Sequence, residues 1–99
     1  MSVAGIDVGN ATSCIALARK GGVDVLLNRE SSRETPAVVS FTEKQRMIGT
    51  AGAGGLATNP KNTVSEIKRL MGKQFDDPVV QADMPLYPFS VVKGPNNEA

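Results

Sequence analysis

The chain has 99 residues, a length that fits one small domain or part of a larger one. Eleven basic residues nearly balance ten acidic ones, so the net charge is only +1, and no nucleic-acid-binding surface is expected. The sequence has no histidine, which removes the commonest metal ligand and general base, and its single cysteine, Cys14, excludes an internal disulfide.

The first 28 residues are predicted to form an antiparallel three-stranded meander. Apolar runs occupy residues 3–8, 14–18 and 23–27, and Gly21-Gly22 marks a two-residue turn between the second run and the third. Because the first two runs do not alternate with polar residues, we expect both faces of these strands to be covered.

The middle of the chain is predicted to combine short strands with polar or glycine-rich connections. Residues 28–36 are polar and turn-rich, residues 37–41 are strand-like, and Met47-Ile48 can form a short partner strand. Glycines crowd residues 49–55, which favours a flexible connection, with a weak helix over residues 51–57 as the alternative.

The clearest predicted helix covers residues 60–71. Asn59-Pro60 is a typical helix start, and Gly72 is a typical stop. At ~100° per residue its apolar side chains share one face, which is formed by Val64, Ile67 and Met71.

Three further elements are predicted after this helix. A second short helix lies within residues 75–84 and is opened by Asp77-Pro78, residues 85–93 form a strand, and residues 94–97 form a turn. A strand followed by a turn and no return strand is an unusual end for a domain. We therefore expect the sequence to be part of a longer one.

The polar turn between the first two strands is the first candidate site. Gly9 is conformationally permissive, and Asn10, Thr12 and Ser13 add side-chain donors to the backbone N–H groups, so the turn could cradle phosphate oxygens. Asp7 would repel a bare phosphate unless a hydrated divalent cation such as Mg²⁺ lay between them. The alternative is an ordinary hairpin whose polar side chains cap their own backbone.

Lys68 is the second candidate, because it falls on the apolar side of the predicted helix. It could project a cation into a cleft to meet a phosphate or orient an attacking water. The alternative is that its apolar stem packs on the protein while its ammonium reaches water.

The order of four segments resembles the start of the heat-shock-protein-70 family. These segments are GIDVGNATSCIALA, SRETPAVVSF, IGTAGAGG and NPKNTVSEIKRLMGKQFDDPVVQAD, and the similarity runs from Val3 to Lys93. The resemblance implies an α/β actin-like ATPase fold, which is ribonuclease-H-like. Residues 1–99 would form an incomplete, N-terminal part of this nucleotide-binding domain. That part would hold the meander, short strands and one clear helix, with the remainder of the domain absent.

The resemblance also assigns roles to the two candidate sites. It implies that Asp7 lies beside the Mg²⁺ shell and binds the metal through water. It further implies that Gly9, Asn10, Ala11 and Thr12 approach the β- and γ-phosphates of ATP or ADP. The lysine of the family's Lys-Arg-Leu motif falls on Lys68, where it would act in catalysis by positioning the water that attacks the γ-phosphate.

Asn10 and Ala11 stand where the family usually has two threonines, so one or two hydroxyl contacts are lost. A glycine-asparagine pair at this point looks like the large 110-kDa branch, and SRETPAVVSF and GTAGAGG look like its plant and algal members. The resemblance implies a nucleotide-exchange factor and holdase, whose partners are conventional 70-kDa chaperones and unfolded client proteins.

Two alternatives stay open beside the exchange factor. The chain could be part of a conventional ATP-hydrolysing 70-kDa chaperone, or a truncated product without function of its own. Because ATP is held between two lobes in this family, we expect the 99-residue chain alone to have no measurable ATPase activity.

We expect a cytoplasmic protein, with the nucleus as a second compartment. The N-terminus lacks a charged region followed by a long apolar run, so no secretory signal is predicted. No segment reaches the ~20 apolar residues that a membrane span needs.

Overall fold

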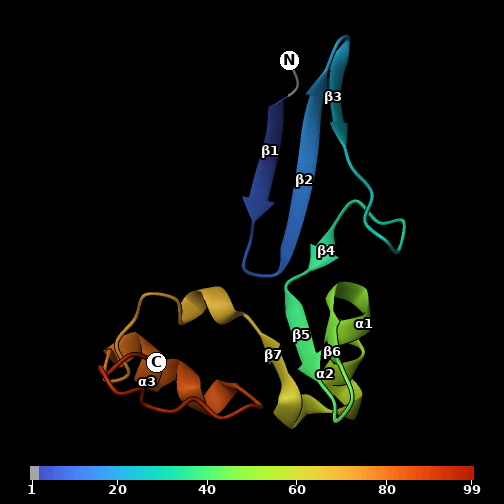
Figure 1. The fold of residues 1–99 in the computed structure, drawn as a ribbon. Coiled ribbons are helices and arrows are strands. Elements are labelled where there is room, and N and C mark those ends of the chain that lie inside the picture. The colour runs from blue at the N-terminus through green and yellow to red at the C-terminus, as the bar shows by residue number, and fades with distance from the viewer. Residues whose placement is uncertain (1–2) are drawn as a thin grey trace.

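The computed structural model describes residues 3–99 and is elongated, with extents of 49 × 29 × 21 Å. Its radius of gyration is 16.4 Å, whereas a compact chain of this length has about 13 Å. One sheet stands at one end, and a second sheet with the helices forms the other end (Figure 1). Residues 35–38 carry the chain from the first sheet to the second.

The first sheet contains the predicted meander. Its antiparallel strands are β1 (Val3–Val8), β2 (Thr12–Arg19) and β3 (Gly22–Val25), in the order β1-β2-β3. The tight turn between β2 and β3 is formed by Lys20 and Gly21, one residue before the predicted Gly21-Gly22 pair, because Gly22 already pairs with Arg19. Gly21 lies in the left-handed region at φ +98°, which suits such a turn. A two-residue strand, β4 (Thr35–Pro36), pairs with the start of β2.

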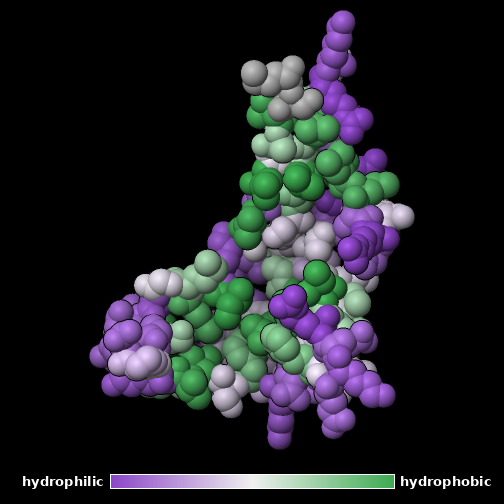
Figure 2. Space-filling view, in the orientation of Figure 1, coloured by the Kyte–Doolittle hydropathy of each residue, from purple (hydrophilic) through white to green (hydrophobic). Residues whose placement is uncertain are grey.

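The prediction that both faces of the first two strands are covered is wrong for this chain. Every residue of β1 is exposed, including Val3 at 61%, Ile6 at 68% and Val8 at 59%. The meander projects beyond the helices, and apolar residues colour its surface (Figure 2). Within residues 3–99 no helix packs on it, so its apolar side chains remain in contact with solvent.

The loop between β3 and β4 is organised by one side chain. The Asn28 side-chain oxygen accepts hydrogen bonds from the N–H groups of Glu30 (2.9 Å) and Ser32 (3.0 Å). The Asn28 amide donates to the Thr35 hydroxyl at 2.9 Å. An asparagine that bonds backbone groups a few residues ahead is a common way to stabilise a turn. These hydrogen bonds hold the loop in a shape that lets β4 pair with the edge of β2.

The second sheet has β5 (Val38–Phe41) at its centre, between β6 (Arg46–Ile48) and β7 (Thr63–Ser65). The predicted strand and its short partner are therefore confirmed. Val38 and Ser40 are buried, and the hydroxyl oxygens of Thr63 and Ser40 lie 2.9 Å apart. This buried polar pair is satisfied, because the single Thr63 hydroxyl proton is donated to the Asn59 carbonyl at 2.7 Å and the Thr63 oxygen accepts from the Ser40 hydroxyl.

The glycine-rich segment is helical. The favoured prediction of a flexible connection is therefore wrong, and the alternative of a helix is confirmed. The segment forms α1 (Gly49–Ala53) and α2 (Gly55–Thr58), which lie against β5. A Cβ on Gly52 would lie 2.7 Å from the Met47 carbonyl oxygen. On Gly55 it would meet the hydroxyls of Ser40 and Thr63. Close packing on the sheet thus outweighs the low helix propensity of glycine.

The helix predicted over residues 60–71 does not form. The chain makes a 3-10 helix (Pro60–Asn62), then β7, and then a second 3-10 helix (Ile67–Arg69), with Glu66 in the left-handed region at φ 55°. Tertiary pairing decides this, because Thr63 and Val64 are β-branched and pair with Ser40 and Val39 of β5.

The last third contains the predicted second helix but not the predicted strand. α3 (Pro78–Asp83) is capped by the preceding Asp77, whose side chain accepts a hydrogen bond from Val79 N–H at 2.8 Å, and a 3-10 helix (Met84–Leu86) follows. Residues 87–93 join no ladder, since Pro85 and Pro88 lack the N–H donors that a strand needs. In the part described, no helix is long and apolar enough to cross a membrane.

Replacing Gly55 with alanine is expected to lower the free energy of unfolding by about 1–3 kcal/mol, because the new methyl group collides with the buried Ser40–Thr63 pair. Gly54→Ala is the matched control. Gly54 is exposed, has right-handed helical angles, and its added Cβ would meet its nearest atom only at 3.5 Å. Chemical denaturation of both variants measures the difference, and equal stabilities would contradict this packing.

Candidate functional site

The turn between β1 and β2 is closed by a short backbone contact. The Gly9 N–H donates to the Thr12 carbonyl at 3.0 Å. A Cβ on Gly9 would collide with that same carbonyl oxygen, although Gly9 itself has no left-handed φ. The glycine is therefore needed for space and not for unusual backbone angles. This differs from the conformational reason predicted from sequence.

The tip of the turn is also tied to the strand that follows the loop. The Ala11 carbonyl accepts a hydrogen bond from the Ala37 N–H at 2.9 Å, next to the Thr12–Pro36 pairing of β2 with β4. The turn is thus held from both sides, by its own closure and by the chain that connects the two sheets. Such a turn is preorganised, so binding a ligand there would cost little ordering of the backbone.

Two consecutive backbone donors at this tip remain open. Among residues 3–99, no protein acceptor takes the N–H groups of Asn10 and Ala11. Successive N–H groups that point into a turn form an anion-binding nest. The Asn10 side-chain oxygen is buried and has no hydrogen-bond partner in the described chain, which leaves room for a donor such as water beside it.

Lys68 reaches this turn from the other end of the molecule. Its Nζ donates to the Val8 carbonyl at 2.6 Å, across 60 residues of sequence. An ammonium has three donors, so two stay free beside the open N–H groups. Lys68 lies on a 3-10 helix and not on the long helix predicted, yet the structure brings the two candidate sites together.

Asp7 lies at the same end of β1 and provides a single carboxylate. It is exposed, and the described residues hold no ion pair between Asp7 and Lys68 within 4.0 Å. They also hold no group of three carboxylate or cysteine ligands that could bind a metal directly. One unpaired carboxylate beside open N–H donors suits Mg²⁺ that keeps most of its waters. The donor set therefore fits a hydrated Mg²⁺ phosphate complex.

Sequence reasoning missed an ion pair next to Lys68. Arg69 makes two hydrogen bonds to the Asp83 carboxylate, from Nε at 2.8 Å and from Nη2 at 3.1 Å. The bond and the charge of Asp83 raise the pKa of the Arg69 guanidinium above its ordinary value. The sequence carried no signal for this pair, since Arg69 and Asp83 are 14 residues apart and fall in two separately predicted helices.

Known proteins resemble almost the whole chain. A family model described as "Hsp70 protein" matches residues 3–99. "Heat shock 70 kDa protein 15" of Arabidopsis thaliana is 57% identical over 96 residues, which cover 97% of this chain and 12% of that protein. "Heat shock protein 110" of Caenorhabditis elegans is 47% identical over 98 residues, which cover 99% of this chain and 13% of that protein.

A third relative is the mitochondrial "Heat shock 70 kDa protein" of Dictyostelium discoideum. It is 44% identical over 98 residues, which cover 98% of this chain and 15% of that protein. The chain thus spans only about an eighth of the length of the curated relatives it matches. Its antiparallel β1–β2–β3 sheet is consistent with the N-terminal part of the family's nucleotide-binding domain. The chain belongs to the heat-shock-protein-70 family.

Proposed function

We propose that this chain forms one wall of an ATP phosphate site in the actin-like nucleotide-binding domain of a heat-shock chaperone. The observation that carries the proposal is the hydrogen bond from Lys68 Nζ to the Val8 carbonyl. It places a cation at the end of β1, where the two open N–H groups of the turn and the carboxylate of Asp7 also lie. A hairpin whose polar side chains only cap their own backbone would not need a lysine held at its end.

The turn itself binds the phosphates. The N–H groups of Asn10 and Ala11 donate to β- and γ-phosphate oxygens, and the two free donors of Lys68 add a positive charge. Gly9 lets the backbone approach closely because it carries no side chain. Asp7 holds waters of a Mg²⁺ ion, and that ion, when bound, neutralises part of the charge on the phosphates.

Lys68 has a second role in hydrolysis. Its Nζ is anchored to the Val8 carbonyl, so its position is defined before nucleotide arrives. From there it orients the attacking water toward the γ-phosphate and stabilises the charge that develops in the transition state. The chain supplies only this wall. The adenosine contacts and the opposite wall belong to the rest of such a domain.

Within the family, we favour a 110-kDa-type exchange factor that uses ATP mainly as a conformational ligand. Asn10 and Ala11 keep their open backbone donors but lack the hydroxyls of two threonines, so the turn retains binding groups and loses side-chain contacts. The identity to "Heat shock protein 110" is 47%. Conventional 70-kDa chaperones and unfolded clients would be its partners, in the cytoplasm and nucleus.

Replacing Gly9 with alanine is expected to open the turn, because the added Cβ collides with the Thr12 carbonyl. Amide hydrogen exchange at residue 9 should then accelerate by about tenfold, as the closing hydrogen bond is lost. Gly5→Ala is the control, since a Cβ there meets nothing within 4 Å. Similar exchange rates at residue 9 in both variants would show that the turn accommodates a Cβ at position 9 without losing its closing hydrogen bond.

Lys68 can be tested in a chimera in which this chain replaces the matching 96 residues of "Heat shock 70 kDa protein 15". Lys68→Met should slow single-turnover ATP hydrolysis by about 10²–10³-fold and change ATP affinity much less. Lys61→Met, at another exposed lysine, is the control and should leave the rate unchanged. An equal rate in the two variants argues against a catalytic Lys68. The 99-residue chain alone should show no turnover.

The exchange-factor proposal has a separate test. The same chimera should accelerate release of labelled ADP from a conventional 70-kDa chaperone when ATP is present. The double variant Asn10→Thr with Ala11→Thr, which restores two hydroxyl groups, should raise hydrolysis by the chimera and leave the acceleration of ADP release intact. If the unmodified chimera does not accelerate ADP release, the chain fits a conventional hydrolysing chaperone instead.

A further inference from the structure

We propose that the Arg69–Asp83 ion pair is a positioning device for Lys68. It holds the 3-10 helix Ile67–Arg69 against α3, and thereby keeps the neighbouring Lys68 Nζ on the Val8 carbonyl. The inference rests on the proposed role of Lys68 in the phosphate site. Its structural part concerns only the position of the lysine, and can be measured without nucleotide.

The pair has the geometry of a rigid clamp. Both carboxylate oxygens of Asp83 accept from Arg69, at 2.8 and 3.1 Å, so the planar guanidinium is fixed in orientation as well as in distance. The Asp83 side chain is only 13% exposed, whereas that of Arg69 is 49% exposed. A lysine at position 69 could supply the charge but not the two-point contact.

Asp83 stands where a carboxylate is unfavourable unless it is paired. It is the last residue of α3, and the carbonyl groups at a helix C-terminus repel a negative charge. It is also buried, and Arg69 is its only side-chain partner among residues 3–99. A nearly buried charge therefore depends on Arg69, which gives the pair a strong tendency to stay closed.

The local backbone needs such a clamp. The 3-10 helix is three residues long and is preceded by Glu66 at a left-handed φ of 55°. Two backbone bonds, Arg69 N–H to Glu66 O and Leu70 N–H to Ile67 O, hold its turns. Only Leu70 is buried there, and Ile67 is 44% exposed. Packing alone therefore fixes one side of this segment, and the ion pair fixes the other.

The test measures how accessible the Lys68 amine is in the 99-residue chain without nucleotide. Lysines are acetylated with a limiting amount of an N-hydroxysuccinimide ester, and each site is quantified by mass spectrometry. In the unmodified chain Lys68 should react about fivefold more slowly than exposed Lys61, which corresponds to one net hydrogen bond. Arg69→Met should remove this protection, and Arg69→Lys should restore only part of it.

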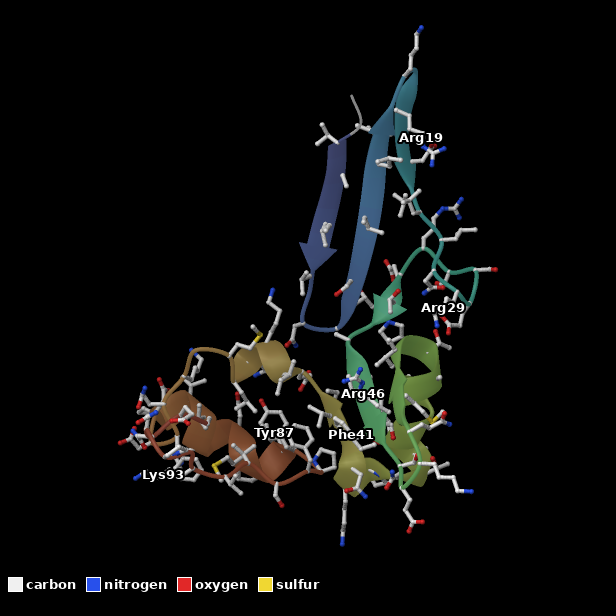
Figure 3. The ribbon with its side chains drawn as sticks, viewed as in Figure 1. Arg19, Arg29, Phe41, Arg46, Tyr87 and Lys93 are labelled. Atoms are coloured by element: carbon white, nitrogen blue, oxygen red, sulfur yellow. The ribbon has the colours of Figure 1, made fainter. Side chains whose placement is uncertain are left out.

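Two controls separate positioning from loss of structure. Arg19→Met removes the exposed Arg19–Asp24 pair at the far end of the meander and should leave Lys68 protected (Figure 3). Asp83→Asn removes the same clamp without stranding a buried charge, so it tests the proposal if Arg69→Met fails to fold. Combining Asp83→Asn with Arg69→Met should expose Lys68 no further than either change alone.

Protection of Lys68 that survives both Arg69→Met and Asp83→Asn, in chains that remain folded by amide exchange, would overturn the positioning role. Additive effects of the two substitutions would overturn it as well, since they would mean that the residues act separately. Neither outcome bears on phosphate binding. The Lys68→Met chimera tests that independently, so failure of one proposal can be told from failure of the other.

Discussion

The hydrogen bond from Lys68 Nζ to the Val8 carbonyl is the contact on which the site depends. It joins the end of the first strand to a turn 60 residues later, and so links the exposed meander to the helical end of the chain. An ammonium held by a carbonyl keeps its charge and two of its donors. The contact therefore positions the lysine and leaves two of its donors free beside the turn between β1 and β2.

Glycine serves close approach at two separate places in this chain. At Gly9 it lets the Thr12 carbonyl close the turn between β1 and β2, and at Gly52 and Gly55 it lets α1 and α2 lie directly on the second sheet. A methyl group would collide in each case, although none of these three glycines has a left-handed φ. Steric space explains them, and conformational freedom does not.

The meander is exposed in residues 3–99 taken alone, which span only about an eighth of the length of the relatives. Its strands supply a straight, hydrogen-bonded support that ends at the turn, while the chain's buried residues gather in and around the second sheet and α3. The apolar faces of Val3, Ile6 and Val8 therefore lie outside any core formed by residues 3–99. The site is built at the junction between this support and the packed end (Figure 1).

The sequence by itself determined the meander, strands β5 and β6 of the second sheet, the family and the residue types of the candidate site. These follow from local apolar runs, turn residues and a motif order that the chain carries in full. Only the tertiary structure decided that residues 60–71 do not form a helix and that the glycine-rich segment does. It alone also decided that Arg69 pairs with Asp83. Helix periodicity singled out Lys68 but placed it on a long helix, whereas the structure places it on a 3-10 helix. The reason is that pairing of Thr63 and Val64 with β5, tight packing at glycines and an ion pair across 14 residues are long-range interactions, which no local pattern encodes.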